Sequence, residues 1–426
     1  MIVLVINAIV YLFFSFYFYR KDKGWNIFNY LLFYYSIIAC LGVLILYTGI
    51  YEHVFGNKSN ESLSPIPYCL CFITYFILFI PFRKLSKDVK LIMPQINWLD
   101  GFMSVWIVVM FAYCILKFYE ASISLSMGFG EVYELRHMEG ETIFDYSGNT
   151  ILKRLRNIGV ILQECTVPIV MLYSIYSLRN GGNKFRLFFL IILCFLPNIL
   201  DGIGLASRGN IFSVFVKILF FVVLFKNYVT RKTKKYIVIM GLIGTFIMVS
   251  YSIIITESRL EDKNSETPIA SIERYFGESF PNLGYSFWDK VHYHPMGERL
   301  FPESYGYSRK ERFDSTRDYH LFWGNKTKVP ILNFKTFFGD LYIEFSVIGA
   351  LIFVSIFALL FRFIMGGKVT YYNIGVAYMY FQICSMGFAG VTKLSGLSLI
   401  TWLFTFLIGY SLKMFNNKTK QRYIIR

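Results

Sequence analysis

The sequence predicts an all-α polytopic integral membrane protein with about 11 transmembrane helices. Three observations lead to this prediction: 55% of the 426 residues are hydrophobic, the apolar residues are gathered into long runs, and the basic residues lie between the runs. A helix needs about 20 apolar residues to cross about 30 Å of hydrocarbon. The runs that approach or reach this length are residues 1–19, 26–51, 65–82, 101–119, 158–178, 187–205, 211–225, 237–256, 341–361, 371–390 and 394–412.

The gaps between the runs differ in charge, and this difference predicts an orientation. Every second gap, from Arg20–Lys23 to the tail Lys413–Arg426, is basic, and these gaps together hold 22 basic residues but only three acidic ones. By the positive-inside rule this face is cytoplasmic, so the N-terminus is expected outside and the C-terminus inside. The first run has no basic residues before it and no small-residue cleavage site, so we expect a retained helix.

The runs divide the chain into three parts. Residues 1–256 are expected to hold the first eight helices, with an outer loop at about 120–157. Residues 257–336 form the largest outer (periplasmic) loop, and residues 337–426 hold the last three helices and a basic cytoplasmic tail. The loop segment Tyr275–Trp288 is rich in aromatic and turn-forming residues. We therefore expect the loop to fold against the membrane helices, where its rings suit either sugar stacking or lipid packing.

The formal net charge of +16 follows from this topology. The sequence shows no aqueous domain with a basic patch, so we expect no nucleic-acid partner. The seven cysteines lie in or beside apolar runs, and none completes the ligand spacing of a metal site. We predict neither a metal nor another cofactor.

Three arginines next to apolar runs are candidates for binding a diphosphate, because a guanidinium holds phosphate oxygens by paired hydrogen bonds. They are Arg208, in a very short turn between two runs, Arg136 and Arg259. Asp201 and Glu257 lie near Arg208 and Arg259 in sequence and are expected to orient them. The alternatives are an interfacial anchor for Arg208 and solvated or loop-paired charges for the other two.

The large loop supplies the candidates for a general base. All five histidines lie on the outer side, and His292 and His294 are two residues apart. We rank the candidates His294, His292 and then Glu278, because a base with a pKa near neutrality suits proton abstraction at physiological pH. Arg299 is a further supporting cation. A loop histidine without a catalytic role remains the alternative.

Among the charged residues inside apolar runs, Glu164 and Lys217 lie farthest from the ends. Glu164 is about two turns into the fifth run, where it could belong to a proton pathway. Lys217 has no acid nearby in its own run, so we expect it to pack or to extend towards the interface.

Several of these features together resemble one protein family. They are the turn Ser207-Arg208-Gly209 after an apolar run, the loop sequence Tyr133-Glu-Leu-Arg136, the large outer loop before Gly339–Gly349, and the eleven apolar runs. In this combination the chain resembles the oligosaccharide repeat-unit polymerases of bacterial surface polysaccharides, the Wzy or O-antigen polymerase type. The resemblance covers most of the chain in architecture.

The resemblance implies a membrane-embedded glycosyltransferase of the GT-C type that acts without a metal on the periplasmic face of the bacterial inner membrane. It would transfer a growing glycan from undecaprenyl diphosphate onto a new lipid-linked repeat unit, and so build O-antigen, capsule or exopolysaccharide. The arginines would stabilise the leaving diphosphate, and a histidine or Glu278 would deprotonate the acceptor hydroxyl. The implied partners are the undecaprenyl-diphosphate-linked oligosaccharide and the lipid bilayer, with a chain-length regulator as an open question.

Two alternatives remain. An O-antigen ligase has a similar topology and moves the finished glycan onto lipid A core. A lipid-linked oligosaccharide flippase or other transporter is expected to place ionisable residues within its helices and to show two repeated halves. Here the polar groups gather in the outer loops and no internal repeat is visible, so the sequence favours a transferase.

Overall fold

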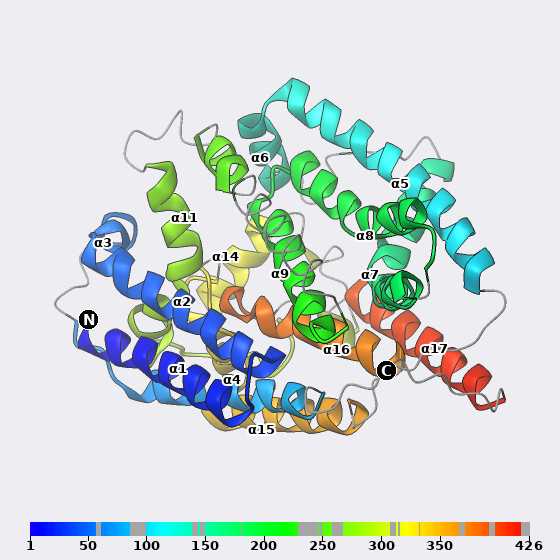
Figure 1. The fold of residues 1–426 in the computed structure, drawn as a ribbon. Helices are drawn as coiled ribbons and strands as arrows, with labels where there is room; N and C mark the ends of the chain where they lie inside the picture. Colours follow the sequence, from blue (N-terminus) through cyan, green and yellow to red (C-terminus); the bar gives the residue numbers. More distant parts are fainter. Residues whose placement is uncertain are drawn as a thin grey trace. The chain divides into compact units, whose positions relative to one another are not determined.

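The computed structural model describes most of the chain as helices and the turns that join them (Figure 1). No β-strand occurs among the described residues, which are 1–56, 61–85, 99–138, 144, 150–179, 181–228, 246, 249–257, 267–306, 312–313, 316–331, 333–365, 371–391 and 397–418. The all-α prediction is therefore confirmed for this part of the chain.

The chain divides into two compact units, and each is described by itself. Unit 1 consists of Met1–Arg83, Arg259–Phe363 and Gln382–Ser395. Its elements are α1 (Ile2–Lys21), α2 (Ile27–Tyr47), α3 (Ile50–Phe55), α4 (Ile66–Leu85), α11 (Pro268–Gly277), α12 (Ser279–Asn282), the π-helix η1 (Leu283–Phe287), the 3₁₀ helix η2 (Pro302–Tyr305), α14 (Thr316–Thr327), α15 (Phe337–Ile364) and the 3₁₀ helix η3 (Gly387–Ala389).

Unit 2 consists of Lys84–Ser258, Ile364–Phe381 and Gly396–Arg426. Its helices are α5 (Leu99–Met127), α6 (Phe129–Met138), α7 (Thr150–Arg179), α8 (Lys184–Gly204), α9 (Arg208–Phe225), α16 (Tyr371–Ser385), whose last turn belongs to unit 1, and α17 (Leu397–Lys418).

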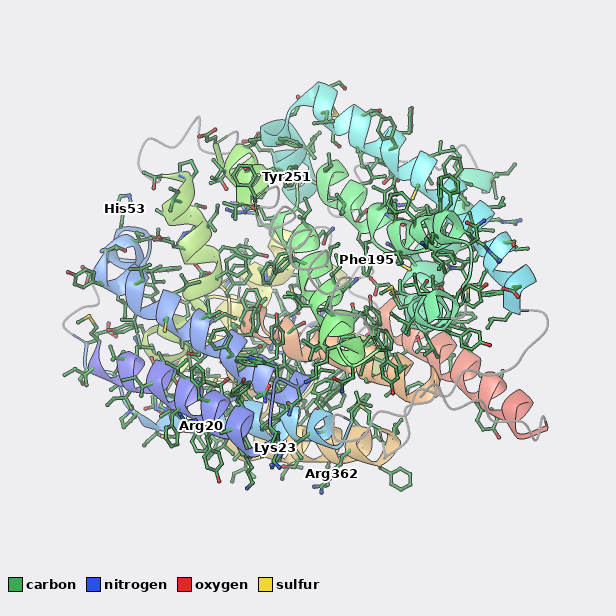
Figure 2. All side chains as sticks on the ribbon, viewed as in Figure 1. Arg20, Lys23, His53, Phe195, Tyr251 and Arg362 are labelled. Carbon is green, nitrogen blue, oxygen red and sulfur yellow. The ribbon has the colours of Figure 1, made fainter. Side chains whose placement is uncertain are left out.

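Eight helices in the described residues are long and apolar enough to cross a membrane, and the protein is a multi-pass membrane protein. These helices correspond to the first seven expected spans and to the ninth. The expected span 237–256 lies largely outside the described residues, and the expected span 371–390 appears as a shorter apolar helix, Ile374–Ser385. Figure 2 shows the side chains, with Arg20 and Lys23 at the α1–α2 turn and His53 beyond the other end of α2.

Much of the expected outer loop 120–157 is helical among the described residues. Helix α5 continues to Met127, α6 follows at Phe129–Met138, and α7 begins at Thr150. The first turns of α7 are too polar to read as membrane-spanning, yet a helix does not have to stop where its apolar run ends. Its polar residues simply continue the backbone hydrogen-bond pattern beyond the hydrocarbon.

Local sequence signals explain where several helices begin. Asn26 and Asn29 cap α2 reciprocally, because each side-chain oxygen accepts a hydrogen bond from the other residue's backbone N–H, at 3.0 and 2.7 Å. Helix α11 has Thr267 as its cap and Pro268 at its first position. The cap of α9 is Ser207, which accepts from the Asn210 N–H. This cap fixes Arg208 as the first residue of α9.

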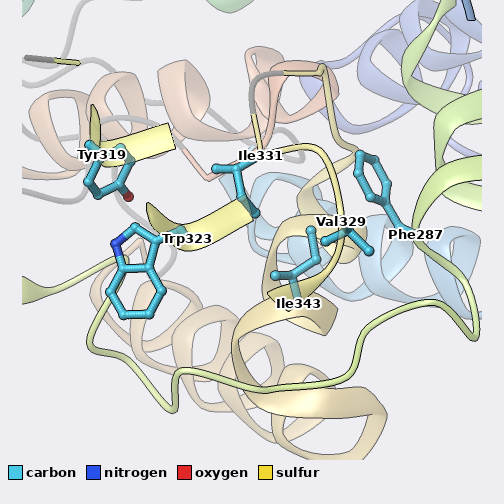
Figure 3. Close-up of a cluster of buried hydrophobic side chains, with 6 residues drawn as sticks. All are labelled: Phe287, Tyr319, Trp323, Val329, Ile331 and Ile343. Atoms are coloured by element: carbon cyan, nitrogen blue, oxygen red, sulfur yellow. The ribbon is translucent and has the colours of Figure 1, made fainter. Parts of the chain in front are cut away.

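The segment between α11 and α15 folds against the apolar helices of unit 1, as expected. The end of α11 approaches α2 closely, since a Cβ on Gly277 would lie 2.7 Å from the Leu41 carbonyl oxygen. Tyr51 donates to the Asn282 side chain at 2.9 Å. Figure 3 shows the cluster that joins this segment to the first half of α15, formed by Phe287, Tyr319, Trp323, Val329, Ile331 and Ile343.

Candidate functional site

Helix α15 is interrupted at Ser346, and the interruption creates the polar centre of unit 1. Ser346 has φ 62° and ψ −176°, which is not helical. A break of this kind frees the preceding backbone carbonyls from their helical partners. Two of them are taken by the segment before η2: the Met296 N–H donates to the Glu344 carbonyl at 2.9 Å, and His294 Nδ1 lies 3.0 Å from the Ile343 carbonyl oxygen.

Arg299 fixes the same segment to α15 through two buried carboxylates. Its side chain is 3% exposed; Nε donates to Glu344 at 2.9 Å and Nη2 donates to Asp340 at 2.7 Å. The second Glu344 oxygen accepts from the N–H groups of Gly297 and Arg299. Burial lowers the pKa of Arg299. The nearby charges of Asp340 and Glu344 raise this pKa by more than burial lowers it, so the net shift is upward. Arg299 is therefore charged and forms ion pairs with both carboxylates.

Asp340 connects this centre to a third part of the chain. Its second carboxylate oxygen accepts from the Val391 N–H at 2.8 Å, just after η3. The neighbouring Gly390 has φ 103°, and a Cβ there would lie 2.7 Å from Asp340 Oδ2. Lys335 is also buried and donates to the carbonyls of Ile331 and Asn333. Arg299 and Lys335 thus balance the charges of Asp340 and Glu344.

The His294 ring is held in one orientation by a hydrogen bond to the backbone of α15. A carbonyl oxygen can only accept a hydrogen bond, so Nδ1 of His294 carries the proton that is donated to Ile343. The other nitrogen, Nε2, makes no hydrogen bond to any described residue. The ring also meets Tyr342 edge-on, with centroids 5.8 Å apart. An imidazole oriented in this way can accept a proton at Nε2 when the ring is neutral, as a general base requires.

The other two candidate bases have different surroundings. His292 is exposed, and its backbone N–H donates to the Thr327 carbonyl at 3.1 Å, whereas its side chain makes no hydrogen bond to a described residue. Glu278 is buried, with one oxygen 3.4 Å from Arg274 and the other accepting from the Phe334 N–H at 3.2 Å. This carboxylate stabilises the fold of the segment, so the geometry favours His294 as the base.

In unit 2, Arg208 begins α9 and is half-buried. Its Nη1 donates to the Thr256 hydroxyl at 2.8 Å. Asp201 does not orient Arg208 as we expected from the sequence: its two oxygens accept from Lys117 at 2.5 Å and from Asn210 at 3.0 Å. The reason is that Lys117, on α5, reaches Asp201 from another helix, which spacing along the chain does not reveal.

Sequence reasoning overlooked Lys117, which also pairs with Glu120 at 2.8 Å. The spacing Lys117-x-x-Glu120 inside an apolar run was the available signal, because residues three apart share a helix face. Lys217 is buried, so it packs, as one of its two expected outcomes had it, and it also pairs with Glu164 of α7 at 2.7 Å. A partner on a neighbouring helix cannot be recognised from the run that holds the lysine.

The remaining predicted site residues are Arg136, Glu257 and Arg259. Arg136 lies in α6, Glu257 is exposed near the edge of the described residues, and Arg259 lies outside them. The candidate bases belong to unit 1, and Arg208, Arg136, Asp201 and Glu257 belong to unit 2. Within the described residues, no group of three or more His, Cys, Asp or Glu side chains is arranged to hold a metal ion.

Comparison of the chain with protein-family models, curated proteins and solved structures finds no match in any of the three.

Proposed function

We propose that this membrane protein polymerises oligosaccharide repeat units carried on undecaprenyl diphosphate, by glycosyl transfer on the periplasmic face of the bacterial inner membrane. The observation that carries the proposal is the position and orientation of the His294 ring. A segment between membrane helices orients this imidazole, with Nδ1 donating to the Ile343 carbonyl and Nε2 free of hydrogen bonds to the described residues. The charge distribution supports an outer location for this segment.

In the proposed reaction, a hydroxyl oxygen of the acceptor sugar forms a bond to the anomeric carbon of the donor glycan. The bond between that carbon and the diphosphate oxygen breaks, and the bond electrons leave with the diphosphate. The hydroxyl proton passes to His294 Nε2. Arg208, with Arg136 and Arg259 as further candidates, stabilises the charge on the leaving diphosphate. The reaction as written requires no nucleotide-sugar donor.

Two other functions remain as alternatives. A ligase would use the same chemistry with lipid A core as acceptor. A lipid-linked oligosaccharide transporter is favoured by one observation, the ion pairs Lys117–Asp201 and Lys217–Glu164 between helices of unit 2. These pairs are closed, each cation being matched by a carboxylate at hydrogen-bond distance, and such pairs also join helices without moving ions. We therefore place the transferase first.

Deletion of the gene in the source bacterium tests the proposal. We expect the surface glycan to shorten to a single repeat unit and the wild-type gene to restore the ladder. Arg208→Ala should fail to restore it, whereas Lys153→Ala, an exposed cation on α7, should succeed. Long chains that persist without the gene would contradict polymerisation, and long chains that accumulate on the lipid carrier without reaching lipid A would indicate a ligase.

A further inference from the structure

Trp288 belongs to a stack of three aromatic rings, whose other two members, Tyr342 and Phe338, lie in the first turns of α15. Its indole is stacked on Tyr342, with centroids 5.1 Å apart and planes 28° apart, and Tyr342 is stacked on Phe338 at 6.1 Å. Tyr342 is also the ring that His294 meets edge-on. One aromatic residue therefore connects Trp288 to the candidate base.

Trp288 is half-buried, and Tyr342 is the only described residue whose ring it contacts. Tyr342 itself is buried, as is Phe338. Two rings of the stack are therefore buried in the core of unit 1, and the third, the flat indole of Trp288, is the most exposed. Its N–H makes no hydrogen bond to a described residue, so a donor is available at the edge of this surface.

The residues that follow Trp288 are polar and exposed. Asp289, Lys290 and His292 all face solvent, and Asp289 has φ 57°, a conformation that Asp adopts more readily than most residues. Lys290 is held in place by Glu61 at 3.1 Å and by the Tyr285 carbonyl at 2.7 Å. The ring of Trp288 is therefore followed directly by charged, exposed side chains, which can form hydrogen bonds to sugar hydroxyls.

We infer that Trp288 is a stacking platform for a pyranose ring of the acceptor glycan, with the Asp289 carboxylate accepting hydrogen bonds from its hydroxyls. A pyranose has a flat apolar C–H face and a rim of hydroxyls, which match a rigid aromatic surface beside a carboxylate. Because Tyr342 contacts both rings, a short oligosaccharide stacked on Trp288 reaches His294. The inference rests on the proposed function and adds the subsite that orients the acceptor.

The experiment is a binding measurement that does not depend on polymerisation. The probe is the repeat-unit oligosaccharide of the source bacterium, released from its lipid diphosphate by mild acid. The purified protein carries 5-fluorotryptophan at its six tryptophans, and the Trp288 and Trp25 resonances are assigned by substitution of each with Phe. Trp25 is the control because it is also half-buried among aromatic rings of unit 1.

We expect the oligosaccharide to shift the Trp288 resonance in a saturable way and to leave the Trp25 resonance unchanged. Trp288→Ala should weaken binding about ten-fold, equivalent to about 1.4 kcal/mol, and Trp288→Phe should retain most of it. An unshifted Trp288 resonance would overturn the inference, with or without binding elsewhere. The proposed function would then stand or fall separately, on whether the same preparation extends the intact lipid-linked unit.

Discussion

Arg299 is the residue on which the polar centre of unit 1 depends most. Replacing it with Met would leave Asp340 and Glu344 buried without their cation, and removal of one partner from a buried pair typically costs about 3–5 kcal/mol. We expect Arg299→Met to lower the unfolding midpoint in detergent by several degrees or more. Arg317→Met, at an exposed arginine, should change stability by no more than about 0.5 kcal/mol. Equal effects would show that the buried network is not important for stability.

His294 is expected to act in catalysis through Nε2 alone. Asn at this position keeps an N–H that can donate to Ile343 but removes the base. We predict that His294→Asn slows glycan transfer at least about 100-fold while the protein stays folded, since general-base catalysis is worth about 10²–10⁴. His292→Asn should change the rate only a few-fold, because that side chain is exposed. The check is the single-turnover rate, and a retained rate in His294→Asn would remove His294 from the mechanism.

At the level of residues, the sequence identified the types of group but not their partners. His294 and Arg299 were recognised because His and Arg stand out beside an aromatic segment. The role of Arg299 was not predictable, since its carboxylates lie more than 40 positions away. Lys117 was overlooked for the related reason that Asp201 approaches it from another helix. These roles depend on partners that come from other elements of the fold, and residue spacing along one helix does not reveal such partners.

At the level of elements, α15 shows where sequence patterns fail. Residues 341–361 read as one apolar helix with a carboxylate, Glu344, near its start, and nothing predicted an interruption at Ser346. The interruption is held by bonds from Met296 and His294 to carbonyls of the preceding turn. A conformation with φ near 60° and ψ near 180° is essentially restricted to glycine and costs other residues about 1–3 kcal/mol. The surrounding contacts must therefore impose it.

This strain predicts an unusual mutational response. Ser346→Gly should stabilise the protein by about 1 kcal/mol, because glycine adopts the observed conformation without strain. Ser355→Gly, in the regular part of the same helix, should instead destabilise it by about 0.5–1 kcal/mol. Thermal unfolding of both variants in one detergent gives the comparison. A loss of stability in Ser346→Gly would mean that α15 is continuous there.

At the level of the whole molecule, hydropathy predicted the membrane class and most of the helices. Seven early runs and the ninth correspond to helices long enough to span, because burying a helix in lipid needs only length and apolarity. The division into two units was not predicted. Unit 1 joins three stretches far apart in the sequence, and their association depends on packing that no local pattern encodes.

The charge distribution makes a separate prediction about orientation. We expect a membrane-impermeant maleimide to label Arg317→Cys in intact spheroplasts and to label Lys21→Cys only after permeabilisation, because basic gaps remain cytoplasmic. Both positions are exposed. The unsubstituted chain, with exposed Cys40 and Cys69, gives the background. Labelling of Lys21→Cys in intact spheroplasts would reverse the orientation.

The most direct test of glycan polymerisation is reconstitution. Purified protein in nanodiscs is mixed with the undecaprenyl-diphosphate-linked repeat unit of the source bacterium, and the products are separated on a gel. We predict a ladder of lengths, lost in Arg208→Ala and in His294→Asn while both variants remain folded. A wild-type protein that leaves the unit unextended, with or without lipid A core, would contradict the assignment and favour a transporter.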